Sequence, residues 1–326
     1  MKYLGRRAIR AVLLLIGVSV LCFLLTEMAP GSFFDEMRLN PQISPETIAS
    51  LRSRYGLDRP LVVRYGRWLR RAVQADFGYS IAYNMPVAPL LWARARNTLL
   101  LNTAAMTLTW LISIPLGVSA ATQRRHRTLD TLFNAASSFL VSIPEVVIAV
   151  ALLAIVVRWR LLPVGGMSSV DHEVLSQWAR VRDIASRILL PTIILTLAES
   201  AIIVRHIRAA VLEVLGTPFV QAGRGLGIGR TRLLFRHVFP VAASPAISLF
   251  GFSLAGLISG SLVVEVVCGW PGLGPLILDA TLSRDFYLVI GGIMLSAVFM
   301  LGGTLIADTM LLLCDPRIRT GAVGAR

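Results

Sequence analysis

Lysine is almost absent from this chain of 326 residues: Lys2 is the only one, and every other basic residue apart from four histidines is arginine. A Gly-x-x-x-x-Gly-Lys phosphate loop therefore cannot be formed, so the chain cannot itself be a P-loop ATPase. Cysteine is nearly as rare, and its three positions, Cys22, Cys268 and Cys314, predict neither a disulfide framework nor a metal cluster. The four histidines share no metal-ligand spacing, and no nucleophile with a positioned base can be assembled, so we expect no catalytic site.

Charge is also scarce. Only 15% of the residues are charged, 55% are hydrophobic, and the mean hydropathy is +0.71. The net charge of +14 would suggest nucleic-acid binding in a soluble chain, but here the arginines flank apolar segments and do not line one polar face. The composition therefore predicts an all-α polytopic membrane protein that binds no nucleic acid.

Apolar windows long enough to span a bilayer occur about six times in the sequence. The first could also be a cleaved signal peptide, but Glu27 lies where a small residue would be needed two positions before Ala29. We therefore favour an uncleaved anchor helix. The six windows cover residues 8–28, 97–121, 131–157, 188–204, 243–264 and 286–313.

Carboxylates inside these windows are costly, which makes Glu145 and Glu199 candidates for the translocation path. Glu145 follows Pro144, which interrupts the third window. Structural pairing of these acids with Arg205, serines or water is an equally weighted alternative at Glu145. The fifth window is rich in glycine and serine, which predicts close approach of other helices.

Basic residues indicate the orientation. With the amino terminus inside, the cytoplasmic pieces hold 16 Lys and Arg and the outer pieces also hold 16. The first outer loop is too long for the positive-inside rule, and leaving it out gives 16 against 6, so both termini are expected in the cytoplasm. We predict an anchor at 1–28, an extracytoplasmic loop subdomain at 29–96 with a short helix over Glu46–Arg54, a permease core of five helices at 97–314, and a cytoplasmic tail at 315–326.

The long basic loop between the fourth and fifth windows has its own pattern. Thr217 and Pro218 predict the start of a helix of about two turns, with the threonine hydroxyl capping free amides. Gly227 and Gly229 predict its left-handed end. We expect Phe219 and Val220 to point outward, so that the helix fits a groove of another protein.

This loop resembles the coupling segment of ABC importer permeases, which has the form Glu-Ala-Ala, three residues, Gly, nine residues, Ile-x-Leu-Pro. The spacing is intact, although Gln replaces Glu, Gly replaces the second Ala, and His replaces Ile. The extra glycines at 223 and 225 predict a less rigid helix. The matching positions in the coupling segment 213–240 are Gln221, Ala222, Gly223, Gly227, His237, Phe239 and Pro240.

A narrower resemblance, to the dipeptide, oligopeptide and nickel permease family, covers nearly the whole chain. The resemblance implies a multi-pass subunit of a bacterial inner membrane that forms half of a path for di- or oligopeptides or similar small solutes. The motifs that carry it are Ala29-Pro30-Gly31, Tyr55 to Pro60, Asp76-Phe77-Gly78 with Ser80, Ser142-Ile143-Pro144, Leu190-Pro191, Arg205 with Arg208, Leu212 to Gly216, Val264-Glu265 with Trp270 to Gly274, Arg284-Asp285, and Asp315 to Arg319.

The same resemblance implies partners. They are a second, similar permease in a heterodimer, one or two cytoplasmic ATPase subunits, and an extracytoplasmic solute-binding protein. This chain would bind no cofactor, and ATP and Mg²⁺ would bind the ATPases. The residues that would contact an ATPase are Thr217, Pro218, Phe219, Val220, Gln221, Ala222, Gly223, Arg224 and Gly227.

Two alternatives stay open from the sequence. Trp270, Pro271 and Gly272 fit either an interfacial turn with an aromatic anchor or an outer gate that meets the binding protein. The whole chain could also be an ion-coupled carrier with Glu145 and Glu199 as a proton relay, or a membrane-embedded enzyme or receptor. ATP-dependent uptake that survives collapse of the proton gradient would distinguish an ABC importer from a carrier.

Overall fold

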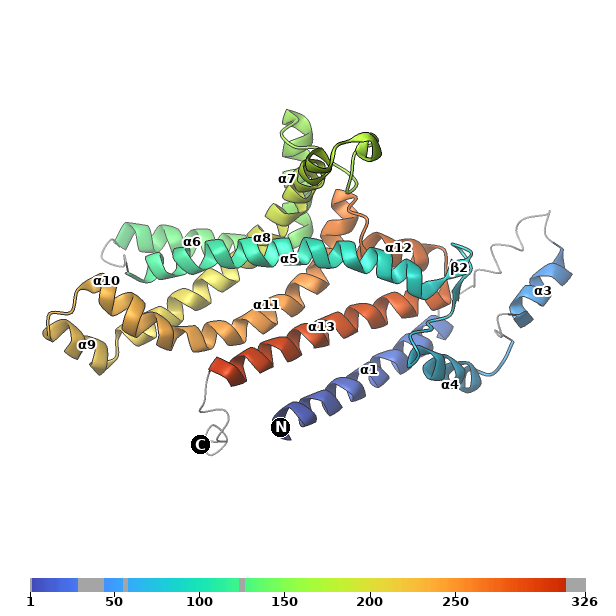
Figure 1. Ribbon diagram of the computed structural model, residues 1–326, viewed down its shortest axis with the longest axis horizontal. Coiled ribbons are helices and arrows are strands. Elements are labelled where there is room, and N and C mark those ends of the chain that lie inside the picture. Colours follow the sequence, from blue (N-terminus) through green and yellow to red (C-terminus); the bar gives the residue numbers. More distant parts are fainter. Residues whose placement is uncertain (1, 29–43, 55–57, 123–126, 315–326) are drawn as a thin grey trace. The chain divides into compact units, whose positions relative to one another are not determined.

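Helices make up nearly all of the regular structure in the computed structural model, which describes residues 2–28, 44–54, 58–122 and 127–314. The helices are α1 (Lys2–Met28), α3 (Pro45–Arg54), α4 (Leu61–Ala72), α5 (Val87–Thr122), α6 (Arg127–Ser142), α7 (Glu145–Trp159), α8 (Gln177–Leu215), α9 (Pro218–Gly225), α10 (Arg230–Leu233), α11 (Phe239–Cys268), α12 (Leu273–Leu282) and α13 (Phe286–Cys314) (Figure 1). A 3-10 turn (His172–Val174), a π-helical turn (Leu234–Val238) and a two-stranded hairpin of β1 (Tyr79–Ser80) and β2 (Met85–Pro86) complete the described elements.

Four helices, α1, α5, α8 and α13, are long and apolar enough to cross a membrane. Two further pairs, α6 with α7 and α11 with α12, pass the same test together but are broken in the middle. The described residues therefore contain four spans, or up to six if each broken pair counts as one. The predicted six windows all fall on these helices.

The third window is the clearest departure from a simple span. The structure bends by 98° between Ser142 and Glu145, so α6 and α7 are two helices and not one interrupted helix. Pro144 explains the break, because proline lacks an amide hydrogen and disfavours the α conformation of the residue before it. The bend places Glu145 in the first turn of α7.

Two compact units divide the chain. One combines the residues up to Thr98 with Pro271–Phe299, and the other combines Leu99–Trp270 with the residues from Met300 onward. Both α5 and α13 contribute to each unit. The predicted segments 29–96 and 97–314 stay predictions.

An aromatic cluster joins α1, α4 and the start of α13 in the first unit. The ring of Phe23 packs edge-to-face on those of Tyr65 and Phe286, with centroids 5.2 and 5.0 Å away. Trp68 is buried beside them and donates a hydrogen bond of 3.2 Å to the carbonyl of Phe77. Edge-to-face pairs of this kind add specificity to apolar burial.

The hairpin is fastened to the start of α13 by a buried carboxylate. Asp285 accepts hydrogen bonds from the Ser80 hydroxyl at 2.6 Å and the Ala82 amide at 3.0 Å. A charge this deeply buried needs such donors. Two motifs of the family resemblance, Ser80 and Arg284-Asp285, thus meet although they lie 205 residues apart.

Close helix contacts in the second unit depend on glycine. α11 packs most extensively on α8, and a Cβ added at Gly251 of α11 would lie 2.4 Å from the Cβ of Ala307 in α13. Asn102 of α5 donates a hydrogen bond of 3.2 Å to the Ser261 hydroxyl of α11. The predicted close approach at the fifth window is confirmed.

Other expectations met different outcomes. The predicted short helix over Glu46–Arg54 is present as α3, which begins one residue earlier at Pro45, and the Ser44 hydroxyl accepts a hydrogen bond of 3.2 Å from the Thr47 amide. No helix was predicted at α12, which lies between the fifth and sixth windows. Ala29-Pro30-Gly31, residues 55–57 and the tail from Asp315 lie outside the described residues.

Candidate functional site

The coupling segment lies in the second unit, where α8 ends and α11 begins (Figure 1). α8 ends at Leu215, and α9 begins at Pro218, one residue after the cap position Thr217. The predicted two-turn helix is therefore confirmed, including proline at its first position.

Thr217 caps α9 differently from the prediction. Its hydroxyl donates a hydrogen bond of 2.5 Å to the carbonyl of Val214, back in α8, and makes no side-chain bond to the free amides of α9. The main-chain carbonyl of Thr217 instead accepts the amides of Val220 and Gln221, both at 3.2 Å. Thr217 therefore links the end of α8 to the start of α9.

Phe219 and Val220 do not form an exposed pair. Phe219 is 48% exposed, whereas Val220 is completely buried. Val220 belongs to an apolar cluster with Val118 of α5, Val211 of α8 and Leu233 of α10. The expectation that both residues point outward was wrong for Val220, because adjacent positions of a helix lie about 100° apart and only one can face a partner.

Gly223 is required by packing. A Cβ added there would lie 2.9 Å from Cδ1 of Leu233, whereas one added at Gly225 would meet no atom within 4 Å. The glycine that replaces the family's second alanine thus lets α9 approach α10. The expectation of a less rigid helix stays a prediction.

Gly227 ends the segment as predicted, with a φ of +75°. The amide of Gly227 donates a hydrogen bond to the carbonyl of Arg224, and the amide of Ile228 donates one to the carbonyl of Gly223. Gly229 differs from the prediction: its φ is −57°, and it precedes α10 as the N-cap residue.

The outer face of α9 is only partly apolar, and the exposed residue Leu226, which directly follows α9, was not among the predicted contacts. Gln221, Ala222 and Arg224 are exposed, as is Leu226, which is 81% exposed. Leu226 follows Phe219 by seven residues, a spacing that brings two side chains to the same face of a helix. This spacing was visible in the sequence.

Beneath α9, a cavity of about 420 Å³ is lined by residues of α5, α8, α9 and α10, among them Thr122, Leu215 and Arg224. Arg230 crosses from α10 and donates a hydrogen bond to the Thr122 carbonyl. The apolar packing of Val220 and this hydrogen bond from Arg230 therefore both attach the coupling segment to the rest of the second unit.

Glu145 and Glu199 face the same helix. A Cβ added at Gly260 of α11 would lie 2.5 Å from Oε2 of Glu145, and one at Gly256 would lie 2.9 Å from Oε1 of Glu199. Gly256 and Gly260 are one turn apart on α11, so the two carboxylates lie against neighbouring positions of one face.

Neither carboxylate forms a hydrogen bond or ion pair with a side chain in the part of the chain that the structure describes, and Arg205 is exposed. The predicted pairing with Arg205 is therefore not formed in this structure. Glu145 instead lies in the first turn of α7, where the helix dipole favours a negative charge.

Trp270 is not an exposed anchor, because it is only 1% exposed. It belongs to the apolar cluster of Leu101, Ile194 and Leu257. Its main-chain amide donates a hydrogen bond of 2.8 Å to the carbonyl of Glu265. The positive φ of Gly269, +66°, makes the turn that brings it inward. The interpretation of Trp270 as an interfacial anchor was wrong, and the gate stays a prediction.

The glycine contact with Glu145 can be tested by a double-mutant cycle. Gly260→Ala should lower the free energy of unfolding in detergent by about 1–3 kcal/mol, because the new methyl overlaps the carboxylate. In a Glu145→Ala background the same change should be nearly neutral, since the obstacle is gone. Gly302→Ala, where a Cβ would meet no atom within 4 Å, is the control and should not destabilise. Equal losses in both backgrounds would contradict the contact.

Comparisons with known proteins assign this chain to a family. Residues 113–320 match the family described as binding-protein-dependent transport system inner membrane component. Residues 1–102 match the description of the N-terminal part of such a membrane component. The first match alone covers more than half of the chain.

Full-length relatives agree. The chain is 34% identical over 320 residues to the oligopeptide transport system permease protein AppB of Bacillus subtilis, covering 97% of this chain and 98% of the relative. It is 31% identical over 315 residues to the nickel import system permease protein NikB of Staphylococcus aureus, covering 96% and 90%.

A solved structure shares the fold. The inward-facing MetNI methionine ABC transporter matches with a TM-score of 0.51 and 18% identity, over 69% of this chain and 96% of the solved one. The membrane subunits of this family are not themselves catalytic. They work with a partner permease, an ATPase and a binding protein. The chain belongs to the binding-protein-dependent transport system inner membrane component family and is a multi-pass permease subunit of an ABC importer in the inner membrane.

Proposed function

We propose that α9 is the element through which an ATPase partner moves this permease. The main support for this proposal is that α9 has one exposed and one buried face. Phe219 is 48% exposed, whereas Val220 at the next position is completely buried. An exposed aromatic next to a buried anchor suits a helix that lies in a partner's groove and stays attached to its own subunit.

ATP binding would close the partner ATPases and displace α9, and the permease pair would rock between inward-open and outward-open states. The free energy for this change comes from the different affinities of ATP for the two states. The permease has to supply only two alternative packings and a firm link between α9 and its spans.

The proposed assembly contains this chain, a second and similar permease in a heterodimer, one or two ATPase subunits, and an extracytoplasmic binding protein. This chain binds no cofactor, and ATP and Mg²⁺ bind the ATPases. The lone lysine at position 2 supports this division of labour, because a phosphate loop needs a lysine after its glycines.

The purified chain alone should therefore hydrolyse no ATP above the rate of a detergent blank, as measured by phosphate release. Turnover should appear only when ATPase subunits are added. Hydrolysis by the isolated chain, together with ATP-analogue labelling mapped onto its own residues, would contradict the proposal.

The proposed solute is a di- or oligopeptide or a similarly small ligand, with the relatives' oligopeptide and nickel systems as support. We propose Glu145 and Glu199 as residues of the translocation path, because their carboxylates lack partners among the described side chains. Trp270, Pro271 and Gly272 are the proposed outer gate, acting through the backbone of the turn after α11.

Both termini are proposed to lie in the cytoplasm, on the basis of the 16 to 6 asymmetry of basic residues. This orientation puts α9 on the cytoplasmic side, where an ATPase can reach it. Reporter fusions after Arg125 and Arg224 should give cytoplasmic signals, and a fusion near Asp58 should give an extracytoplasmic one. A reversed pattern at Arg224 would rule out the orientation and the coupling role together.

Truncation of Phe219 tests the contact with the ATPase. Phe219→Ala should weaken retention of the ATPase by roughly thirtyfold, the equivalent of about 2 kcal/mol at a hot spot, with little change in thermal stability. Val220→Ala should instead lower thermal stability, since it removes buried methyl groups. Retention can be measured by co-purification at several ATPase concentrations.

Phe139→Ala is the matched control, because Phe139 is 67% exposed on α6 and lies outside the coupling segment. It should leave retention unchanged. Gly227→Val should keep the complex but uncouple ATP hydrolysis from uptake, because valine opposes the φ of +75°. Normal uptake and retention in both Phe219→Ala and Gly227→Val would show that the loop is an ordinary connection.

A further inference from the structure

A cavity of about 520 Å³ lies in the first unit, whereas the coupling segment and Glu145 belong to the second. It lies among α4, the hairpin of β1 and β2, and the first turn of α13. Four arginines line it, and no acidic residue does so in the part of the chain that the structure describes. The lining residues are Ser53, Arg59, Arg64, Arg67, Trp68, Arg71, Gly78, Tyr79, Asn84 and Tyr287.

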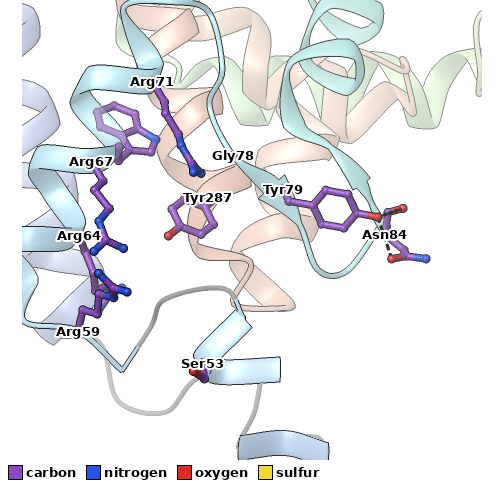
Figure 2. A pocket seen from close by; sticks show the side chains of 10 residues that line it. Ser53, Arg59, Arg64, Arg67, Arg71, Gly78, Tyr79, Asn84 and Tyr287 are labelled. Carbon is purple, nitrogen blue, oxygen red and sulfur yellow. Dashed lines mark hydrogen bonds between the residues drawn. The ribbon is translucent and has the colours of Figure 1, made fainter. Parts of the chain in front are cut away.

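Figure 2 shows how these side chains lie around the cavity. Tyr287 lies in the middle, with the side chains of Arg59, Arg64 and Arg67 on one side and those of Tyr79 and Asn84 on the other. Gly78 is needed for this arrangement: it has a φ of +104°, and a Cβ there would lie 3.0 Å from Cγ of Tyr287.

Arg64 is the innermost cation. It is only 8% exposed, and its Nη1 donates a hydrogen bond of 2.8 Å to the carboxylate of Glu27 in α1. Its guanidinium lies 4.8 Å from the ring centre of Phe286. Its Nε is nevertheless buried without a hydrogen-bond partner among the described residues. This donor is enclosed by protein atoms, so Arg64 serves mainly to hold α1, α4 and α13 together beside the cavity.

Among the side chains that the structure describes, few negative charges balance the arginines of the cavity. Glu27 balances Arg64, but Arg59, Arg67 and Arg71 form no ion pair with any described acidic side chain. Three guanidinium groups that face one space favour a ligand with a net negative charge. Guanidinium matches the oxygens of phosphate in bidentate geometry.

Two spans locate the cavity at the membrane surface. Glu27 lies one residue before the end of α1, and Tyr287 is the second residue of α13. Both helices are long and apolar enough to cross a bilayer, and only 11% of the most apolar window of α1 is buried in the protein. A space beside the ends of two such helices lies at the level of lipid headgroups. Tyrosine and tryptophan are typical of that level.

We propose that this cavity binds the phosphate of an anionic phospholipid headgroup. The volume exceeds what a single inorganic phosphate needs, and the ends of α1 and α13 place the site where headgroups are present at high concentration. Bound lipid would accept hydrogen bonds from Arg67 and Arg71 and would hold α4 against the membrane surface.

Lipid binding to the full-length chain, measured by native mass spectrometry, tests this proposal. The ligands are phosphatidylglycerol, phosphatidylcholine with the same acyl chains, and inorganic phosphate. Phosphatidylglycerol should bind best. The double variant Arg67→Gln/Arg71→Gln should lose about tenfold in its affinity, as expected when charge-assisted hydrogen bonds are removed. Arg64 stays intact, because it links α1, α4 and α13.

Arg70→Gln/Arg96→Gln is the matched control. Both arginines are exposed, neither lines the cavity, and the variant loses the same charge. Its affinity should change less than about twofold at about 0.15 M salt, where exposed charges are screened beyond roughly 8 Å.

Three results would overturn the proposal. Equal losses in the two double variants would show diffuse attraction to the membrane. Inorganic phosphate that binds as well as the lipid would identify a free ion as the ligand. Unchanged lipid binding in Arg67→Gln/Arg71→Gln, with weaker docking of the binding protein, would identify the cavity as a protein contact. None of these results bears on ATPase retention by α9.

Discussion

Backbone amides and carbonyls inside a bilayer must be hydrogen-bonded within the protein, and the spans of this chain are built around that constraint. Where a helix is continuous, its own hydrogen bonds suffice. Where it breaks, particular residues take over: Pro144 lacks an amide, and the carbonyl of Gly269 accepts the amide of Gly166 at 3.0 Å. Glu145 and Trp270 lie directly beside these two breaks. The residues proposed for the path and the gate are thus found where regular hydrogen bonding ends.

Small residues determine how the remaining helices pack. With lipid on the outside, helix association depends on close contact more than on the hydrophobic effect. α11 accordingly presents Gly251 to α13, Gly256 to Glu199 and Gly260 to Glu145. The same helix contacts apolar and charged partners, and glycine permits both. The two carboxylates therefore occupy space that side chains of α11 leave open.

The sequence predicted the helical fold, the family, the start of α9 and the left-handed Gly227, because each depends on local chemistry or on hydropathy. It did not predict that Val220 is buried or that Gly223 contacts Leu233, since both depend on α10 folding back against α9. The 98° bend at Pro144 was visible only as an interruption, because proline fixes the position of a break but not its angle. The arginine cavity was not predicted either, because it depends on tertiary contacts between segments that are far apart in the sequence, such as those of Arg64 and Tyr287.

The buried side of α9 has a mechanical consequence. Val220 belongs to one apolar cluster with residues of α5, α8 and α10, so a displacement of α9 acts on this cluster and is not absorbed by a flexible connection. Protein interiors are packed as densely as organic crystals, which makes such a block stiff. Recognition and transmission are therefore separate properties of one short helix. Substitutions on its outer face would change which partner binds. Substitutions on its inner face would change how much of the partner's displacement reaches the membrane spans.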